Sequence, residues 1–213
     1  MRLGLTLIIL NRHSGLVPLS PNREGESLSR RRLRVCARND DKRREYSPVV
    51  SCPEDPRQQH FNMIKVLFIC HGNICRSPMA EFVMKHLVEE AGLSEQFEIA
   101  SAATSTEEIG NPVYPPARRK LAEHSIGCEG KTARQMTRKD YAYYDYIIAM
   151  DHNNLRNLKR MFGEDTDHKI SLLMDYTHRP GDVADPWYTG DFEATWVDVL
   201  EGCKGLLEHL ETR

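Results

Sequence analysis

The pattern of apolar and polar positions becomes regular only from Met63 onward. Ile64–Ile69 is a short, largely apolar run, which predicts a strand buried on both faces. Apolar side chains then recur at helical spacing between residues 79 and 91, and Gly92 is placed to end that helix. The chain therefore opens its regular part with a strand, a loop and a helix.

The same alternation continues to the end of the chain. Further strands are predicted at residues 97–103, Asp145–Met150 and Lys169–Met174, and helices at residues 115–127, from Asp151 as N-cap, and at residues 192–210. Strands that alternate with helices predict an α/β layered structure around a parallel sheet. Ligands of such folds bind beyond the carboxyl ends of the strands, and Cys70 lies at one of those ends.

Residues 1–62 differ in composition from the rest. They carry 12 Lys and Arg against 7 Asp and Glu, a net charge of +5, whereas residues 63–213 carry 17 against 24, a net charge of −7. A basic, proline-broken stretch buries too little apolar surface to offset its loss of entropy on ordering. We predict a disordered leader, or an upstream mis-start with Met63 as the natural start, before one domain over 63–213. A signal sequence at Leu3–Leu10 or a transit peptide is less favoured.

The overall composition is that of a globular protein, with 40% apolar and 28% charged residues. The six cysteines are scattered and do not form the spacing of a secreted disulfide framework. A reducing compartment, and therefore a cytoplasmic location, fits this pattern best.

The segment "CHGNICRSP", residues 70–78, carries the candidate chemistry. A strand–loop–helix unit directs backbone N–H groups and a helix N-terminus at one point, which makes an anion site. The glycine-rich nucleotide-binding loop is absent; instead Cys70 opens this loop and Arg76 closes it. Gly72 and Asn73 suit a tight turn, and Pro78 suits the first helical turn.

This arrangement favours nucleophilic chemistry at Cys70. A thiol among N–H donors, beside a guanidinium, loses its proton easily and can attack a bound tetrahedral oxyanion. Arg76 can clamp two phosphoryl oxygens, and Ser77 can donate a hydrogen bond to the sulfur. Two alternatives remain: an inert buried cysteine, or a metal site with Cys70, His71 and Cys75, whose spacing does not match the usual ligand patterns.

Phosphoryl transfer to cysteine also needs an acid that protonates the leaving oxygen. Asp185 in "VADPWYTGD" is the candidate, because Pro186 holds its backbone extended. Trp187 and Tyr188 follow as flat walls for an aromatic ring. The alternative is an ordinary Asp-Pro turn without chemistry.

Residues 63–213 resemble the low-molecular-weight protein tyrosine phosphatases, in "CHGNICRSP", in "DPWY" and in the central segment "ARQMTRKDYAYYDYIIAMDHNNLRNL". The resemblance implies a three-layer sandwich with a four-stranded parallel sheet in flavodoxin-like order, flanked by helices. It implies Cys70 as nucleophile, Arg76 as phosphate clamp and Asp185 as general acid and then base. The implied binding residues are His71, Gly72, Asn73, Ile74, Cys75, Ser77, Trp187 and Tyr188, with Asn73 and Ser77 as loop organisers and Cys75 as redox partner of Cys70.

The resemblance also implies the partners. They are a tyrosine-phosphorylated protein substrate and a tyrosine kinase; no cofactor, metal, nucleic acid or membrane partner is expected. A monomer or weak self-association is expected. Two positions depart from the family pattern: Ala103 stands where the family usually has glycine, and Glu107 aligns roughly with a tryptophan that forms a substrate wall in mammalian members. Trp187 would supply the aromatic surface instead.

Three other functions are compatible with parts of the sequence. A thioredoxin-coupled arsenate reductase shares the loop but needs a downstream cysteine pair, for which only Cys128 and Cys203 remain. A protein arginine phosphatase carries threonine where Ile74 stands. A non-catalytic phosphotyrosine-binding module would be expected to have lost Cys70 or Asp185, and both are present.

Overall fold

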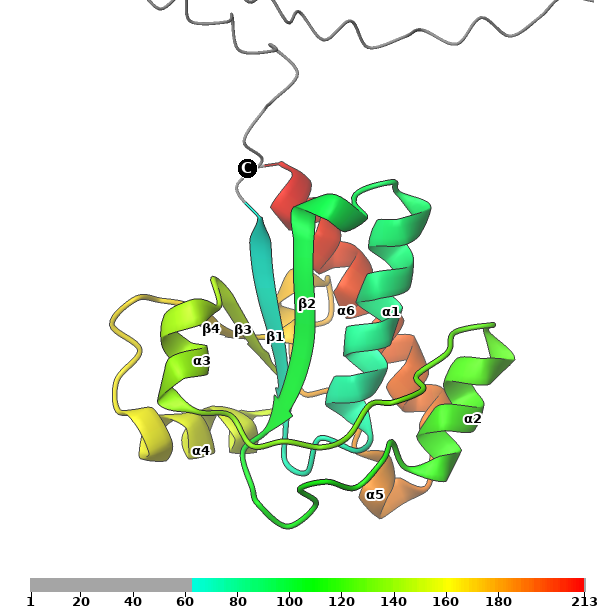
Figure 1. The fold of residues 1–213 in the computed structure, drawn as a ribbon, viewed down its shortest axis with the longest axis horizontal. Helices are drawn as coiled ribbons and strands as arrows, with labels where there is room; N and C mark the ends of the chain where they lie inside the picture. Colours follow the sequence, from blue (N-terminus) through cyan, green and yellow to red (C-terminus); the bar gives the residue numbers. More distant parts are fainter. Residues whose placement is uncertain (1–62, 213) are drawn as a thin grey trace, which may run out of the picture. The chain divides into compact units, whose positions relative to one another are not determined.

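A computed structural model describes residues 63–212 of the chain (Figure 1). The predictions made for residues 1–62, a disordered leader, a mis-start or a targeting segment, lie outside the described residues. Within the described part, short strands alternate with helices. The elements are β1 Ile64–Cys70, α1 Arg76–Glu90, η1 Ser94–Gln96, β2 Phe97–Ala103, α2 Pro115–Glu123, α3 Arg138–Tyr143, β3 Tyr146–Ala149, α4 His152–Phe162, β4 Ile170–Leu172, η2 Leu173–Tyr176, α5 Pro186–Thr189 and α6 Phe192–Glu211.

The four strands form one parallel sheet in the order β2-β1-β3-β4. This confirms the predicted fold, including the flavodoxin-like order. Strand β1 is central, and its residues Val66–Ile69 have no exposed surface, which explains why it reads as an apolar run without alternation. At the carboxyl end of the sheet Cys70 lies opposite Ala103 of β2, and Ile69 lies opposite Ala149 of β3.

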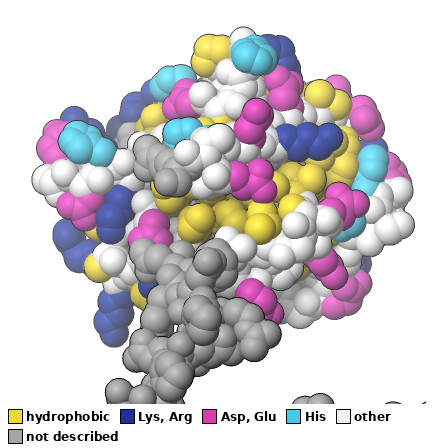
Figure 2. Space-filling view, turned by 90° about the horizontal axis from the view of Figure 1, so that it is seen from above, with side chains coloured by type: hydrophobic (Ala, Val, Ile, Leu, Met, Phe, Trp, Pro, Cys, Tyr) yellow, Lys and Arg dark blue, Asp and Glu magenta, His cyan; other side chains and the backbone are white. Residues whose placement is uncertain are grey.

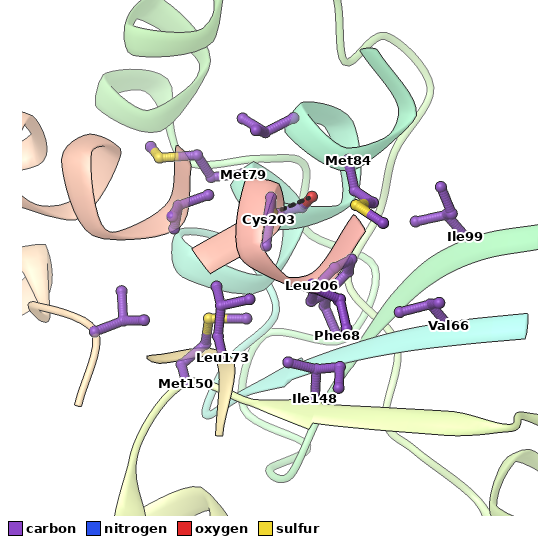
Figure 3. Close-up of a cluster of buried hydrophobic side chains, with 14 of the residues drawn as sticks. Val66, Phe68, Met79, Met84, Ile99, Ile148, Met150, Leu173, Cys203 and Leu206 are labelled. Atoms are coloured by element: carbon purple, nitrogen blue, oxygen red, sulfur yellow. Dashed lines mark hydrogen bonds between the residues drawn. The ribbon is translucent and has the colours of Figure 1, made fainter. Parts of the chain in front are cut away.

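Helices cover both faces of the sheet and give three layers. One face packs against α1, α2 and α6, through a core that includes Phe68, Met84 and Leu206 (Figure 3). The other face packs against α3 and α4 and contains Leu67 and Leu158 (Figure 1). Alternate residues of β1 therefore belong to different cores, as the period of a strand requires.

Close approach between α6 and η2 depends on glycine. A Cβ atom at Gly205 would lie 1.9 Å from the carbonyl oxygen of Tyr176, and one at Gly202 would lie 2.5 Å from Leu173 Cγ. In the same helix Cys203 is fully buried and its thiol donates to the Ala80 carbonyl at 3.6 Å (Figure 3). This helix is thus held against α1 and η2 by contacts that leave no room for added atoms.

Most predicted elements are confirmed, with four main differences. Helix α2, predicted over residues 115–127, ends at Glu123. The strand predicted at Lys169–Met174 ends at Leu172, because the Asp175 carboxylate accepts the Leu172 N–H at 3.0 Å and the chain turns into η2. Helix α3 was not predicted; it has a capping box at Thr137 but too few residues for an apolar stripe. Helix α5 forms where the sequence suggested only a loop after Asp185.

The loops that follow β1 and β2 gather with α5 at the carboxyl edge of the sheet, below the strands in Figure 1. The opposite edge, at the amino ends of the strands, shows a band of apolar side chains bordered by acidic ones (Figure 2).

No helix of residues 63–212 is long and apolar enough to cross a membrane. The polar residues singled out in the sequence belong to the carboxyl edge.

Candidate active site

The cysteine loop, residues 70–76, links the central strand to the first helix. Cys70 is the last residue of β1, and α1 begins at Arg76. The backbone beyond the strand continues to pair, since the Cys70 carbonyl accepts the Thr104 N–H at 2.9 Å and the His71 carbonyl accepts the Ser105 N–H at 3.0 Å. The loop therefore starts from a rigid, buried position between β2 and β3.

Asn73 holds the loop in its curled shape. Its φ of 58° lies in the left-handed region, which asparagine tolerates better than most residues. Its side chain is buried, donates to Ser77 Oγ at 2.9 Å and to Ser101 Oγ at 2.7 Å, and accepts the Arg134 N–H at 3.2 Å. All of the polar atoms of the side chain thus have partners, as a buried amide requires.

A backbone N–H and a hydroxyl group contact the sulfur of Cys70. The Asn73 N–H donates to Sγ at 3.2 Å, and the Ser77 hydroxyl lies 3.0 Å from it. The Ser77 hydroxyl accepts the Asn73 amide N–H at 2.9 Å, and the Ala102 carbonyl lies 3.5 Å away as a second acceptor for its proton. The thiol is buried, with 3% of the residue exposed. A negatively charged sulfur would be stabilised here by fixed dipoles rather than by water.

The guanidinium of Arg76 is held between two carboxylates. Nη1 lies 2.6 Å from Asp151 Oδ2, and Nη2 lies 2.6 Å from Asp185 Oδ2, although the residue is only 3% exposed. Burial lowers the pKa of Arg76, but the charges of Cys70 and Asp185 and the hydrogen bond with Asp151 outweigh it, so the pKa is raised. The cation is therefore permanent and its orientation is fixed.

The contact between Asp151 and Arg76 was not predicted from the sequence, where Asp151 was only an N-cap and a reserve candidate for the general acid. As the predicted N-cap of α4, Asp151 does accept the Asn154 N–H at 2.6 Å. Its other oxygen orients Arg76, a contact between residues 75 positions apart. The available signal was an aspartate two residues after β3, the strand beside β1 at the carboxyl edge.

Asp185 reaches the site from a separate segment. Its side chain caps α5 by accepting the Trp187 N–H at 3.1 Å, and 25% of the side chain is exposed. The segment before it is fastened to the fold, because the Val183 N–H donates to the Met150 carbonyl at 2.8 Å and the Ala184 N–H to Asp198 at 3.0 Å. The carboxyl group therefore approaches the cysteine loop on a short, anchored arm.

These side chains surround a pocket of about 190 Å³. Nine of the predicted site residues line it: Cys70, His71, Gly72, Ile74, Cys75, Arg76, Asp185, Trp187 and Tyr188. Asn73 and Ser77 lie behind the loop and support it. Trp187 and Tyr188 are 58% and 86% exposed, so they flank the mouth of the pocket rather than its base.

Two glutamates complete the lining. Glu107, at one of the positions that depart from the family pattern, accepts a hydrogen bond at 3.1 Å from His71 Nε2. Glu108 was not anticipated; its Cγ would lie 3.1 Å from a Cβ at Gly72, so it packs over the loop backbone. The rim of the pocket is therefore acidic on the side of the loop after β2. The second departure, Ala103, is buried at the end of that strand.

Cys75 is a free, buried thiol that also lines the pocket. Burial, followed by the nearby charges of Cys70 and Asp185, raises the pKa of Cys75 to about 12. Its thiol is therefore protonated at neutral pH. Cys128 and Cys203 are both buried in the main core, and burial raises the pKa of each thiol. Among residues 63–212 no cluster of three or more potential metal ligands occurs.

Comparison with known proteins accounts for this combination of fold and loop. The model of the family described as low molecular weight phosphotyrosine protein phosphatase matches residues 65–213. The chain belongs to this family. It is 40% identical over 151 residues to the low molecular weight protein-tyrosine-phosphatase YfkJ of Bacillus subtilis, which covers 70% of this chain and 97% of that protein. It is 43% identical over 148 residues to the rat low molecular weight phosphotyrosine protein phosphatase, with coverages of 67% and 93%.

Solved structures of family members have the same fold. The crystal structure of YfkJ from Bacillus subtilis superposes with a TM-score of 0.69 at 39% identity, covering 70% of this chain and 96% of that one. The structure of a Drosophila arginine phosphatase superposes with a TM-score of 0.65 at 33% identity, with coverages of 70% and 98%. The names of these similar proteins give different phosphorylated residues, so substrate choice must be argued from the pocket.

Proposed function

We propose that this chain hydrolyses phosphotyrosine in proteins, and small aryl phosphates, through a covalent phosphocysteine at Cys70. The observation that carries the proposal is the convergence of three segments on one pocket. Cys70 ends the central strand, Arg76 opens α1, and Asp185 precedes α5, yet the Arg76 guanidinium contacts Asp185 at 2.6 Å and the pocket includes all three residues.

In the first step the sulfur of Cys70 attacks phosphorus and the bond to the tyrosine oxygen breaks. Asp185, in its protonated form, gives its proton to the departing phenolate oxygen. Arg76 binds two phosphoryl oxygens through its planar guanidinium, while Asp151 keeps that group oriented. Loop N–H groups and the amino end of α1 provide the remaining charge stabilisation.

In the second step a water molecule attacks phosphorus and the sulfur–phosphorus bond breaks. Asp185, now a carboxylate, accepts a proton from the water, and inorganic phosphate leaves. Ser77 and the Asn73 N–H stabilise the departing thiolate through the contacts described above. The same two donors thus favour the thiolate both before attack and after hydrolysis.

Several features support phosphotyrosine over other phosphorylated residues. Trp187 and Tyr188 offer flat apolar surface at the mouth of the pocket, where an aromatic ring would lie. Ile74, a branched side chain, lines the pocket where arginine phosphatases carry threonine. The arsenate reductase alternative is disfavoured because Cys128 and Cys203 are buried core residues.

We assign the catalytic domain to residues 63–213, since the family match begins at residue 65 and the curated relatives are covered almost end to end. Its partners in this proposal are tyrosine-phosphorylated proteins and the kinase that produces them. A cytoplasmic location would keep Cys70 and Cys75 reduced. A monomer or weak self-association is part of this proposal, since Cys70, Arg76 and Asp185 of one chain meet in the same pocket.

A steady-state comparison of four substrates tests the proposal. The purified chain is assayed with phosphotyrosine, phosphoserine and phosphoarginine peptides of the same sequence, and with arsenate plus thioredoxin. The proposal requires the highest kcat/KM with phosphotyrosine. A higher value with phosphoarginine, or turnover of arsenate, would instead assign one of the two related activities.

A further inference from the structure

A second groove, of about 440 Å³, adjoins the catalytic pocket. It lies between the start of α2 and the segment around α5, which are neighbours at the lower right of Figure 1. Trp187 belongs to both linings, so the two hollows are neighbours that share this side chain as a wall. The residues that line the groove are Tyr114, Pro116, Arg119, Pro186, Trp187, Gly190 and Phe192.

The walls of the groove are aromatic and well fixed. The Tyr114 ring lies 5.7 Å from the Trp187 ring and 6.1 Å from the Phe192 ring, measured between centroids. The Tyr114 N–H donates to the Ile74 carbonyl at 2.8 Å, which fastens this wall to the cysteine loop. A surface built from rings and prolines loses little entropy when it binds a partner, because few side chains must be immobilised.

Arg119 is the charged member of the lining, and it is exposed. The two glutamates nearest along these helices, Glu123 and Glu193, are both bound by Lys120. Among the described residues no carboxylate lies at ion-pair distance from the Arg119 guanidinium, although its charge, after that of Lys120, helps to lower the pKa of Glu123. The catalytic pocket differs, because its own rim carries Glu107 and Glu108.

We infer that this groove binds the segment of the substrate polypeptide beside the phosphotyrosine, and that it selects an apolar side chain together with a carboxylate. The inference rests on the proposed function, since it places phosphotyrosine in the adjoining pocket. Because the groove and the catalytic pocket share Trp187, the polypeptide beside a bound phosphotyrosine is the expected occupant of the groove. Arg119 is the cationic residue of an otherwise largely apolar lining, so it favours a substrate carboxylate.

The spacing limits which substrate positions reach the groove. An extended chain rises roughly 3.3 Å per residue, so one to three residues from the phosphotyrosine cross a single tryptophan ring. A carboxylate that stays over the catalytic pocket would meet Glu107 and Glu108 and be repelled. The preference should therefore hold on one side of the phosphotyrosine and not on the other.

Matched peptides and two arginine variants test the inference. The peptides carry a Leu-Asp pair at one to three positions before or after phosphotyrosine, and matched peptides carry Leu-Asn as the neutral analogue. Acetyl-phosphotyrosine amide, which has no flanking residues, is the reference substrate. Arg119→Glu reverses the charge in the groove. Arg118→Glu makes the same change at the adjacent exposed residue, which lines neither the pocket nor the groove.

The wild-type chain is expected to prefer the Asp peptide over the Asn peptide by about 2- to 5-fold in kcat/KM on one side, the range of an exposed ion pair. Arg119→Glu should reverse this ratio, a total change of about 4- to 25-fold, and Arg118→Glu should leave it near the wild-type value. The preference should shrink in 1 M salt, where screening acts within about 3 Å.

Three results would overturn the inference without touching the proposed function. The first is turnover of the reference amide without a preference for the Asp peptide. The second is an equal effect of Arg119→Glu and Arg118→Glu on that preference. The third is a Tyr114→Ala variant whose association state changes in sedimentation while its peptide selectivity does not. The last result would make the groove an interface between copies of the chain. Absence of turnover with the reference amide would instead refute the proposed function itself.

Discussion

Replacing Asp185 with asparagine removes the proton donor from the site while keeping its shape. Asparagine has nearly the same volume, and its carbonyl oxygen can still accept the Trp187 N–H that caps α5. The change also removes the ion pair between Asp185 Oδ2 and Arg76 Nη2. Arg76 remains oriented, because Nη1 keeps its 2.6 Å contact with Asp151. The phosphate clamp should therefore survive the substitution.

The expected loss depends on the leaving group. Positioned general acid catalysis contributes about 10²–10⁴-fold, which corresponds to about 3–5 kcal/mol of activation free energy. The phenol of tyrosine has a pKa of about 10 and needs the proton, whereas a strongly acidic phenol leaves as its anion. Asp185→Asn should slow phosphorylation of Cys70 by the full factor with phosphotyrosine and by far less with an activated aryl phosphate.

The assay must isolate the first chemical step. Steady-state kcat would combine the two steps, because Asp185 also activates the water that hydrolyses the phosphocysteine. The pre-steady-state burst of released phenol is therefore measured across a series of aryl phosphates of rising leaving-group pKa. Asp191→Asn is the matched control, since Asp191 caps α6 through the Ala194 N–H and asparagine is an equally good cap.

The reasoning predicts a steeper dependence of burst rate on leaving-group pKa in Asp185→Asn than in the wild type, and an unchanged slope in Asp191→Asn. An equal slowing of the burst for every leaving group would show that Asp185 is not the general acid. A large rise in KM for all substrates would show instead that the carboxylate acts through the orientation of Arg76.

Three further outcomes follow from the geometry. Peroxide should inactivate the chain reversibly, because the sulfenic acid formed at Cys70 can condense with the Cys75 thiol in the same loop, which forms a disulfide and releases water. Mass spectrometry of a peptide digest identifies the disulfide, and a bond from Cys70 to any other cysteine would contradict this prediction. Gly205→Ala should cost about 1–3 kcal/mol in urea unfolding, since the new Cβ meets the Tyr176 carbonyl oxygen, and an unchanged midpoint would refute that contact. Glu81→Gln should flatten the acid limb of the stability curve: burial raises the pKa of Glu81, but its ion pairs and hydrogen bonds outweigh burial and lower it, so its stabilisation is present above the usual glutamate value of about 4.3 and lost as pH falls through the lowered value. An identical acid limb in the variant would contradict this assignment.

The sequence predicts best those elements that are long enough for the spacing of their apolar residues to indicate which side chains are buried. Val66–Ile69 is apolar throughout because β1 is an interior strand that is covered on both faces. The long helix α6 likewise shows its buried stripe directly. Elements shorter than two turns, such as α3 and α5, carry no such period, and their formation depends on capping side chains at Thr137 and Asp185.

The candidate site was predictable where its residues are contiguous and less so where the fold joins distant segments. The loop from Cys70 to Ser77 can be read from its own chemistry. The contact of Arg76 with Asp151 spans 75 positions and follows only from the register of β1 and β3. The packing of Glu108 over Gly72 depends on the path of the loop after β2, which no periodicity encodes.

The claim that Cys70 is the nucleophile is tested most directly by trapping the intermediate. The wild-type chain is mixed with a radiolabelled aryl phosphate, quenched within the first turnover and digested, and the labelled peptide is identified. We predict label on the peptide that contains Cys70, no label and no turnover in Cys70→Ser, and retained vanadate binding by that variant, because the cradle consists of loop N–H groups and Arg76. Label on any other residue, or substantial turnover by Cys70→Ser, would contradict the mechanism.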